Sequence, residues 1–418
     1  MSNTPSFHRV VITGTGAITP AGIGVEALWG NLMAGTCCLS SLPEETVEKF
    51  NVSVGGCIPG YDPLEQGFSK KEARRFAKFV QYAIVAADEA MAQSGIDLET
   101  VDRDRFACVF GTGIGGLEIF ERESVVLNTK GPKRVNPLFI PIMIPNMCSG
   151  NLSIRYGLRG ECTTTVTACA SGSHSIGEAY RLIRFGLADA ALTGGTEEGM
   201  APMALAGFGN LGAITRQQDR LRASRPFDVN RDGFVPAEGA GALILESLEH
   251  AQARGAHIIA EITGFGSTAD AHHITAPDPQ GLGAMRAMRQ ALAEGGFTVG
   301  DLGHLNAHGT STHANDSMES AALYALAGEA ARDIPVVSVK GCTGHMLGGA
   351  GAVEAIVCAL SVVNQVVPPT VGFSEADPES PVRVSSQPVF DYPQKVALSN
   401  SLGFGGHNAS LALSPFAE

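Results

Sequence analysis

The chain has 418 residues, of which 44% are hydrophobic and 17% are charged, and its formal net charge is −13 at pH 7. This length predicts two fused folding units around a large core, and the negative charge argues against a nucleic-acid partner. The nine cysteines include no C-x-x-C pair. Their scatter argues against a disulfide framework or a zinc ribbon and favours a reducing, cytoplasmic location.

The sequence contains no segment that we expect to enter a membrane. Its first residues, MSNTPSFHRVV, lack the layout of a signal peptide. Residues 135–154 and 355–374 are uncharged over about the length of a membrane span. Prolines or polar residues interrupt both stretches, so we expect them to be buried inside the fold.

Weak internal similarity divides the chain into two halves, 1–256 and 257–418. Each half opens with a β-rich segment that ends in glycines, and near its end a glycine-rich turn leads into an alternating strand. The matching segments are 10–17 with 260–267, and 239–246 with 405–413. In the middle of each half a strand precedes a helical pattern, at 163–166 before 170–185 and at 334–339 before 349–363. Strands that alternate with helices predict an α/β architecture.

A basic segment, residues 68–80, predicts a single helix that begins at Ser69. Its apolar residues fall on a face that we expect to pack inward: Phe76, Phe79 and Val80. Its basic residues form a stripe on another face: Lys70, Lys71, Arg74, Arg75 and Lys78. Such a stripe is usually a solvated face, but on an acidic protein it also fits an acidic partner.

The segment VTACASGSHS places Cys169 where a β-rich run passes into a helical pattern. A helix start favours the thiolate form of a cysteine, and the small neighbours Ala168 and Ala170 leave room for a substrate. The arrangement resembles a nucleophile elbow. Because a single cysteine is more often buried and inert, Cys169 alone leaves both interpretations open.

Two histidines occupy small-residue loops at the ends of predicted strands. His308 lies in NAHGTST, and His345 lies in KGCTGHMLGGAGA, the second-half counterpart of the Cys169 loop. The duplication therefore predicts that the Cys169 and His345 loops face each other across a pseudo-two-fold axis. The histidines lack the paired helical spacing of metal ligands, so no metal is predicted. The turn NSLGFGGHNA offers unhindered backbone amides that can hold an oxyanion.

The segments TACASG, NAHGTST, KGCTGHMLGGAGA and NSLGFGGHNA occur in this order along the chain. Together with GTGIGGLE and SRPFDVNRDGFVPAEGAG, they resemble the β-ketoacyl-acyl carrier protein synthases, and the resemblance covers essentially the whole chain. The Cys-His-His set resembles the elongating enzymes rather than the Cys-His-Asn initiating type, and the synthase II branch is the most similar. The resemblance implies a duplicated thiolase-like fold with five layers, α-β-α-β-α, and pseudo-two-fold halves.

The resemblance also implies roles for individual residues. Cys169 matches the acyl-accepting nucleophile, and His308 and His345 match the pair that acts on the malonyl group. Lys340 matches a lysine beside that pair, and Glu354 matches its acidic neighbour and is expected to contact the substrate. Phe404 matches a gate whose amide joins that of Cys169 in an oxyanion hole. The other substrate-binding matches are Thr310 and Thr312 on the pantetheine arm, and Ile114 and Phe208 along the acyl pocket.

The implied reaction is a decarboxylative Claisen condensation in fatty acid elongation. An acyl group on Cys169 reacts with malonyl-acyl carrier protein and gives carbon dioxide and a β-ketoacyl product two carbons longer. The implied assembly is a homodimer without metal or cofactor. The implied partner is acyl carrier protein, and the residues expected to dock it are Lys70, Lys71, Arg74, Arg75, Arg134 and Arg216.

Three other functions fit parts of the sequence. A ketosynthase of a specialised polyketide or polyene pathway would use the same residues. A chain-length-factor-like partner subunit would lack the nucleophile, so the presence of Cys169 argues against it. A papain-like protease also combines a cysteine with a later histidine, but its C-G-[SA]-C-[WY] signature is absent.

Overall fold

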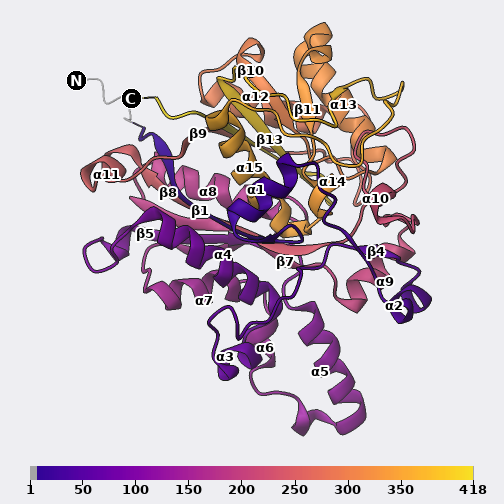
Figure 1. Ribbon diagram of the computed structural model, residues 1–418. Coiled ribbons are helices and arrows are strands. Elements are labelled where there is room, and N and C mark those ends of the chain that lie inside the picture. The colour runs from indigo at the N-terminus through magenta and orange to yellow at the C-terminus, as the bar shows by residue number, and fades with distance from the viewer. Residues whose placement is uncertain (1–6, 418) are drawn as a thin grey trace.

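Strands from both halves of the chain join in one mixed sheet (Figure 1). The computed structural model describes residues 7–417. The first half of the sheet, in strand order, contains β1 (Val10–Thr19), β8 (Glu238–Ser247), β7 (Ala190–Glu198), β5 (Phe106–Gly111) and β6 (Cys162–Thr165). The second half contains β9 (Ala260–Ala269), β14 (His407–Ser414), β13 (Val396–Gly403), β10 (Leu302–Asn306), β11 (Pro335–Val337) and β12 (Arg383–Val384). The short β2 (Gly22–Ile23) pairs with β1, while β3 (Ser40–Ser41) and β4 (Val54–Gly55) form a separate ribbon.

The two halves of the sheet repeat one pattern of strand pairing. β5 runs parallel to β6 and β7, and β8 pairs antiparallel with β7 and β1. In the second half β10 runs parallel to β11 and β13, and β14 pairs antiparallel with β13 and β9. The halves join where β1 pairs with β9, from Val10 opposite Ile262 to Ile12 opposite Ala260. The predicted duplicated α/β fold is confirmed, whereas a boundary between residues 256 and 257 stays a prediction.

Helices cover both faces of each half of the sheet (Figure 1). α4 (Lys78–Ser94) packs on the outer face of the first half, while α12 (Leu282–Glu294) and α13 (His313–Ala327) cover the outer side of the second. α8 (Ser171–Arg184) and α15 (Ala350–Asn364) lie between the halves. The layers therefore follow the order α-β-α-β-α. The other α-helices are α1 (Val25–Met33), α2 (Glu44–Phe50), α3 (Lys70–Arg75), α5 (Leu117–Lys130), α6 (Phe139–Met143), α7 (Met147–Tyr156), α9 (Pro202–Asn210), α10 (Arg220–Ala223), α11 (Leu248–Ala253) and α14 (Lys340–Thr343).

The central helix α15 is buried on nearly all sides, which explains why Glu354 is its one charged residue. Glycine allows this close packing, because a Cβ on Gly351 would lie 2.4 Å from the Ser173 Oγ of the neighbouring α8. A window over this region, Leu347–Asn364, is long and apolar enough to cross a membrane, but 83% of it is buried inside the protein. Such burial is typical of a core helix.

The basic segment forms two helices, so the prediction of one continuous helix was wrong. Ser69 does cap the first, α3, in a capping box with Glu72. The helix ends at Arg75, because Phe76 is extended, with φ −97° and ψ 133°. Gln81 Nε2 stabilises the break by donating to the carbonyl oxygens of Ala73 and Phe76, at 3.1 and 2.8 Å.

The break also shortens the basic stripe. Lys78 begins α4, and its Nζ lies 3.0 Å from a carboxylate oxygen of Glu118. The stripe therefore consists of the four exposed basic residues of α3. Phe79 and Val80 are buried, as predicted.

Candidate active site

Cys169 lies in the turn between β6 and α8. The Thr167 amide donates to Ser171 Oγ at 2.9 Å, and that hydroxyl donates to the Ala168 carbonyl oxygen at 2.6 Å. These bonds hold Ala168 at φ 50°, a left-handed conformation that is unfavourable for alanine. The tight turn leaves Cys169 two residues before the first residue of the helix, which agrees with the predicted nucleophile elbow.

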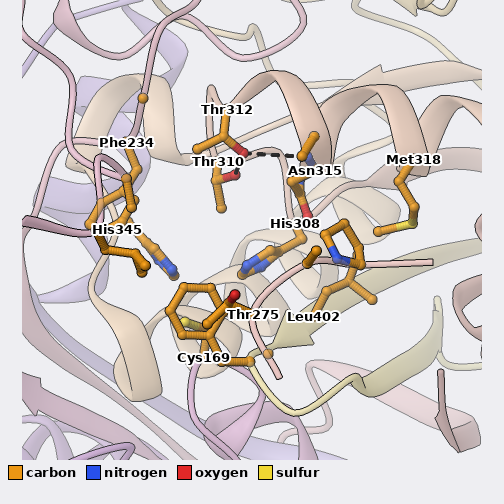
Figure 2. Close-up of a pocket in the computed structure, with 18 of the residues that line it drawn as sticks. Cys169, Phe234, Thr275, His308, Thr310, Thr312, Asn315, Met318, His345 and Leu402 are labelled. Atoms are coloured by element: carbon orange, nitrogen blue, oxygen red, sulfur yellow. Dashed lines mark hydrogen bonds between the residues drawn. The ribbon is translucent and has the colours of Figure 1, made fainter. Parts of the chain in front are cut away.

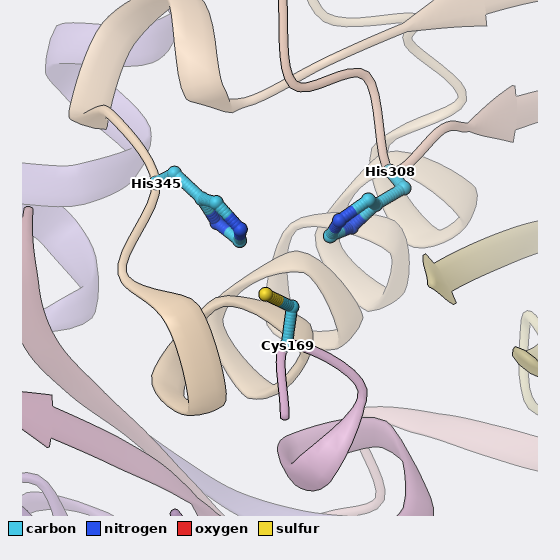
Figure 3. A group of neighbouring side chains, drawn as sticks. All are labelled: Cys169, His308 and His345. Atoms are coloured by element: carbon cyan, nitrogen blue, oxygen red, sulfur yellow. The ribbon is translucent and has the colours of Figure 1, made fainter. Parts of the chain in front are cut away.

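Two histidines from the second half face the cysteine (Figure 3). The Sγ of Cys169 and one ring nitrogen from each of His308 and His345 all lie within 4.8 Å of one another. The two imidazole rings are nearly perpendicular, with centroids 5.1 Å apart. His308 follows β10 and His345 follows α14, so both come from the loops named in the sequence. The duplicated fold thus brings the three side chains together.

Burial controls the protonation of these three groups. It raises the pKa of the Cys169 thiol to about 12, and the charge of Lys340 opposes this shift. This direction is opposite to the expectation that the helix start would favour the thiolate, and desolvation is its largest cause. Burial and the charge of Lys340 hold the pKa values of His308 and His345 well below their ordinary value. In the resting protein the cysteine is a thiol and both imidazoles are neutral.

Lys340 lies behind His308 and pairs with Glu354. Its Nζ donates to the His308 carbonyl oxygen at 2.5 Å and lies 3.4 Å from His308 Nδ1. The pair is fully buried, and burial raises the pKa of Glu354 although Lys340 opposes the shift. Neither residue lines the central cavity. Glu354 is therefore a partner of Lys340 rather than the substrate contact that we expected.

A cavity of 430 Å³ opens above the three side chains (Figure 2). Its lining includes Phe208, Thr310, Thr312 and Phe404, as the resemblance implied. Thr310 and Thr312 share a hydrogen bond of 2.9 Å between their hydroxyl oxygens, and Thr312 caps α13. The wall combines apolar rings with a few hydroxyl and imidazole groups, which suits an acyl thioester.

Ile114 does not line this cavity, in contrast to the expectation. Its amide instead donates to Oε1 of Glu197 at 3.2 Å. The same buried carboxylate accepts hydrogen bonds from the amides of Gly113 and Gly348, at 2.7 and 3.1 Å. Glu197 therefore ties the GTGIGG loop to the loop that follows His345. Sequence reasoning missed it, although the acidic pair in TGGTEE was a signal at the end of an apolar strand.

Glu319 of α13 is a second buried acid that sequence reasoning missed. It accepts from the amides of His308 and Gly309, at 2.8 and 2.6 Å, and from Asn315 Nδ2 at 2.9 Å. Burial raises the pKa of Glu319 to about 7. These hydrogen bonds to Glu319 hold the backbone of the His308 loop in place.

The turn that carries Phe404 packs against the cysteine turn. A Cβ on Gly403 would lie 3.3 Å from the Cys169 backbone nitrogen and 2.6 Å from the Thr167 carbonyl oxygen. Phe404 is 37% exposed at the cavity, and its ring centroid lies 6.3 Å from that of Phe208. The backbone contact agrees with an oxyanion hole built from both turns.

The residues expected to dock a carrier protein are all exposed, but they lie in more than one place: Lys70, Lys71, Arg74, Arg75, Arg134 and Arg216. The first four lie on α3, and Arg75 shares a small cavity with Leu138, which is near Arg134 in the chain. The Arg216 amide donates to Asp232, a residue of the central cavity, at 3.3 Å. Figure 1 shows α3 well apart from α9, which precedes Arg216.

The donors of Cys169, His308 and His345 are also of the kind that Zn²⁺ prefers. Sequence spacing did not reveal this grouping, because the three residues converge only in the fold. The absence of a resident metal stays a prediction.

The chain matches known proteins along most of its length. The family models "Beta-ketoacyl synthase, N-terminal domain" and "Beta-ketoacyl synthase, C-terminal domain" match residues 8–251 and 259–374. A 3-oxoacyl-[acyl-carrier-protein] synthase 2 of Staphylococcus aureus (strain COL) is 46% identical over 408 residues, which are 98% of each chain. A protein of the same name from Vibrio cholerae serotype O1 is 43% identical over 413 residues, which are 97% of this chain and 99% of the relative. The solved AntDE:AntF complex contains a type II PKS acyl-carrier protein bound to its ketosynthase. One chain of that complex superposes on this chain with a TM-score of 0.90 and is 32% identical to it. The match covers 98% of this chain and 100% of that chain.

Proposed function

Because the chain belongs to the β-ketoacyl synthase family, we propose that Cys169, His308 and His345 perform the two halves of a decarboxylative condensation. The chain is a condensing enzyme of the acyltransferase class that acts in fatty acid elongation. One observation carries the assignment of residues: a thiol and two neutral imidazoles converge within 4.8 Å below a cavity that fits an acyl thioester.

The first half-reaction transfers an acyl group to Cys169. Because the resting group is a thiol, its proton must leave as the acyl thioester arrives, and the two neutral imidazoles are the bases beside it. The sulfur then attacks the thioester carbonyl, and the amides of Cys169 and Phe404 hold the resulting oxyanion. The tetrahedral intermediate expels the thiol of the carrier, which takes up the proton.

The second half-reaction removes carbon dioxide from a malonyl thioester and leaves an enolate. Neutral His308 and His345 donate hydrogen bonds to its oxygen. Lys340 Nζ lies 3.4 Å from Nδ1 of His308, which suits the tautomer in which Nδ1 accepts and Nε2 carries the proton that is donated to the enolate. The carbanion attacks the acyl carbonyl, and the Cys169 sulfur leaves. The product is a β-ketoacyl thioester two carbons longer.

We also propose that acyl carrier protein delivers both substrates. The solved relative in complex with an acyl-carrier protein supports a partner of this kind. The acidic surface of the acyl carrier protein would contact the four basic residues of α3. Arg134 and Arg216 would add further basic charge to this docking surface. Apart from these groups the net charge of the chain is unfavourable for an acidic partner.

A homodimer in the cytoplasm is part of the same proposal. β6 ends the sheet and exposes its outer edge, and the nearby side chains of Ile154 and Val166 are 77% and 51% exposed. Unpaired strand edges beside apolar residues favour pairing with a second copy. Ile154→Glu with Val166→Lys should convert a dimer to a monomer in analytical ultracentrifugation. An unchanged sedimentation coefficient would place the dimer contact elsewhere.

A condensation assay tests the proposed function. The enzyme is supplied with malonyl-carrier protein and acyl-carrier primers of several lengths, and mass spectrometry identifies the products. Products two carbons longer than each accepted primer support the assignment. Activity only with carrier proteins of polyketide pathways would instead favour a specialised ketosynthase. The thiol in the cavity argues against a non-catalytic chain-length-factor-like subunit, and the five-layered fold excludes a papain-like protease.

A further inference from the structure

A pair of cysteines lies next to the catalytic loop of the second half, outside the cavity. Cys38 Sγ lies 3.8 Å from Cys342 Sγ, and the Cys38 amide donates to the Cys342 carbonyl oxygen at 3.0 Å. Cys342 is completely buried on α14. The backbone bond holds the two residues side by side, so the sulfur contact is a fixed feature of the fold.

Solvent reaches this pair from one side. A surface cavity of 530 Å³ is lined by Cys37, Cys38 and Arg220, among others. The neighbouring Cys37 is turned away from Cys342, because its Sγ donates to the Arg220 carbonyl oxygen at 3.2 Å. A small oxidant in this cavity therefore meets Cys38 with Cys342 directly behind it.

The two thiols of the pair differ in acidity. The Cys342 thiol donates to the Cys38 sulfur and lowers the pKa of Cys38; burial opposes this shift, and the charge of Arg220 assists it. Burial raises the pKa of Cys37. Since thiolates are the forms that react with peroxides, Cys38 is the sulfur of this pair that should react first.

We propose that Cys38 and Cys342 form an oxidation site, at which a hydroperoxide converts the two thiols into a disulfide. The Cys38 thiolate attacks the peroxide, the O–O bond breaks, and the alkoxide or hydroxide leaves, so that Cys38 becomes a sulfenic acid. The Cys342 sulfur then attacks the Cys38 sulfur, the S–O bond breaks, and water leaves with the Cys342 proton. The two sulfurs together lose two electrons, and the peroxide gains them.

Formation of this disulfide should disturb the active site. The sulfur atoms must approach from 3.8 Å to about 2.05 Å. α14 cannot shift without consequence, because Ser224 Oγ donates to the Lys340 carbonyl oxygen at 2.7 Å and a Cβ on Gly341 would lie 1.9 Å from Val371 O. The same helix presents Lys340 to His308 and leads to His345. This second consequence rests on the proposed function, whereas the disulfide itself does not.

The experiment uses the full chain carrying Cys169→Ala, which removes the thiol of the cavity. The protein is treated with hydrogen peroxide under native conditions, its remaining thiols are alkylated, and unreduced peptides are identified by mass spectrometry. We expect a cross-linked peptide that joins Cys38 to Cys342 and is separated by dithiothreitol. Cys37→Ser in the same chain should keep the cross-link, and Cys38→Ser should abolish it without a loss of thermal stability.

Recovery of Cys38 and Cys342 as separate alkylated thiols, or as separate sulfinic acids, would overturn the proposal. A cross-link through Cys37 would do the same. The coupling to catalysis is measured in the chain with Cys169 intact and protected by a preloaded acyl group. Peroxide should then slow condensation in this chain but not in Cys38→Ser, and dithiothreitol should restore the rate. An unchanged rate in the cross-linked protein would overturn the coupling.

Discussion

The loop after β6 and the loop after β11 occupy equivalent places in the two halves, but they differ in structure and in chemistry. The first turns within a few residues from strand to helix, and its strained Ala168 presents Cys169 to the cavity. The second inserts α14 before α15, which places Lys340 against Glu354 and leaves His345 at the cavity. One loop offers a reacting atom, and the other offers groups that hold protons and charge.

The comparison separates what the duplicated fold provides from what the loop sequences provide. Two similar halves of one sheet, with α8 and α15 between them, bring equivalent loops face to face. The chemistry arises because the two loops have diverged while their positions are kept. Changes in one loop should therefore affect a different step of the reaction from changes in the other.

Removal of the thiol from the first loop should have the largest effect. Cys169→Ala should lower condensation by about 10⁵-fold or more, because the acyl group loses its attachment atom. Mass spectrometry of the intact protein after incubation with acyl-carrier protein measures the acylation directly. Cys57→Ala, at a half-buried cysteine outside the cavity, is the matched control and should stay active. Acylation of the Cys169→Ala chain would contradict the division between the loops.

Removal of one imidazole should affect the two half-reactions unequally. His308→Ala or His345→Ala should slow decarboxylation of malonyl thioester by about 10²- to 10⁴-fold, because the enolate loses a hydrogen-bond donor. Acyl transfer should fall less, since the remaining imidazole still accepts the Cys169 proton. Single-turnover acylation and release of labelled carbon dioxide measure the two steps. Equal losses in both would show that the loops do not divide the reaction.

The histidine loops should also make the protein sensitive to acid. The folded pKa values of His308 and His345 are well below 6.5, so below pH 6.5 the unfolded chain binds protons that the folded chain does not. The contribution of these two histidines to the free energy of unfolding should therefore fall as the pH falls, by up to about 1.4 kcal/mol per pH unit for each histidine, whereas Glu319 with its raised pKa contributes the opposite slope. Urea unfolding between pH 7 and pH 5 measures this slope. His345→Ala should reduce the slope, and Cys169→Ala should leave it unchanged.

The smallest effect is expected from the surface. Changing Lys71, Arg74 and Arg75 of α3 to Glu should raise the KM for carrier protein by about tenfold at low salt and weaken its salt dependence. A pantetheine thioester that needs no docking should react at an unchanged rate. Arg332→Glu with Arg383→Glu, at exposed sites of the second half, is the control. Normal kinetics of the triple variant with carrier protein would exclude α3 as the docking site.

Local patterns in the sequence were sufficient to predict the duplicated architecture and the Cys169, His308 and His345 loops. These features depend on strand-to-helix transitions and on small residues beside the reactive ones. The break at Phe76 could not be predicted in this way, because its residues are compatible with a helix. The side chain of Gln81, which directly follows the segment, stabilises the extended conformation through hydrogen bonds to backbone carbonyl oxygens, and such bonds leave no mark in the hydrophobic pattern.

Local sequence patterns also could not predict the buried groups that support the site without lining the cavity. Glu197 holds amides that lie far from it in both directions along the chain, and no periodicity marks such a role. The raised pKa of Cys169 has the same origin, since helix position is visible in the sequence but burial is not. Long-range packing thus decides the properties that motif recognition leaves open.

The position of β1 at the middle of the sheet has a consequence for how the protein is made. β1 is the first strand to be synthesised, yet its partners β8 and β9 begin at residues 238 and 260. During translation only the short β2 can pair with the end of β1, and the rest of the strand has no partner until more than half of the chain has been made. Strand pairing over such sequence distances is slow, and unpaired edges promote aggregation. The nascent chain should therefore depend on chaperones that shield its N-terminal strand.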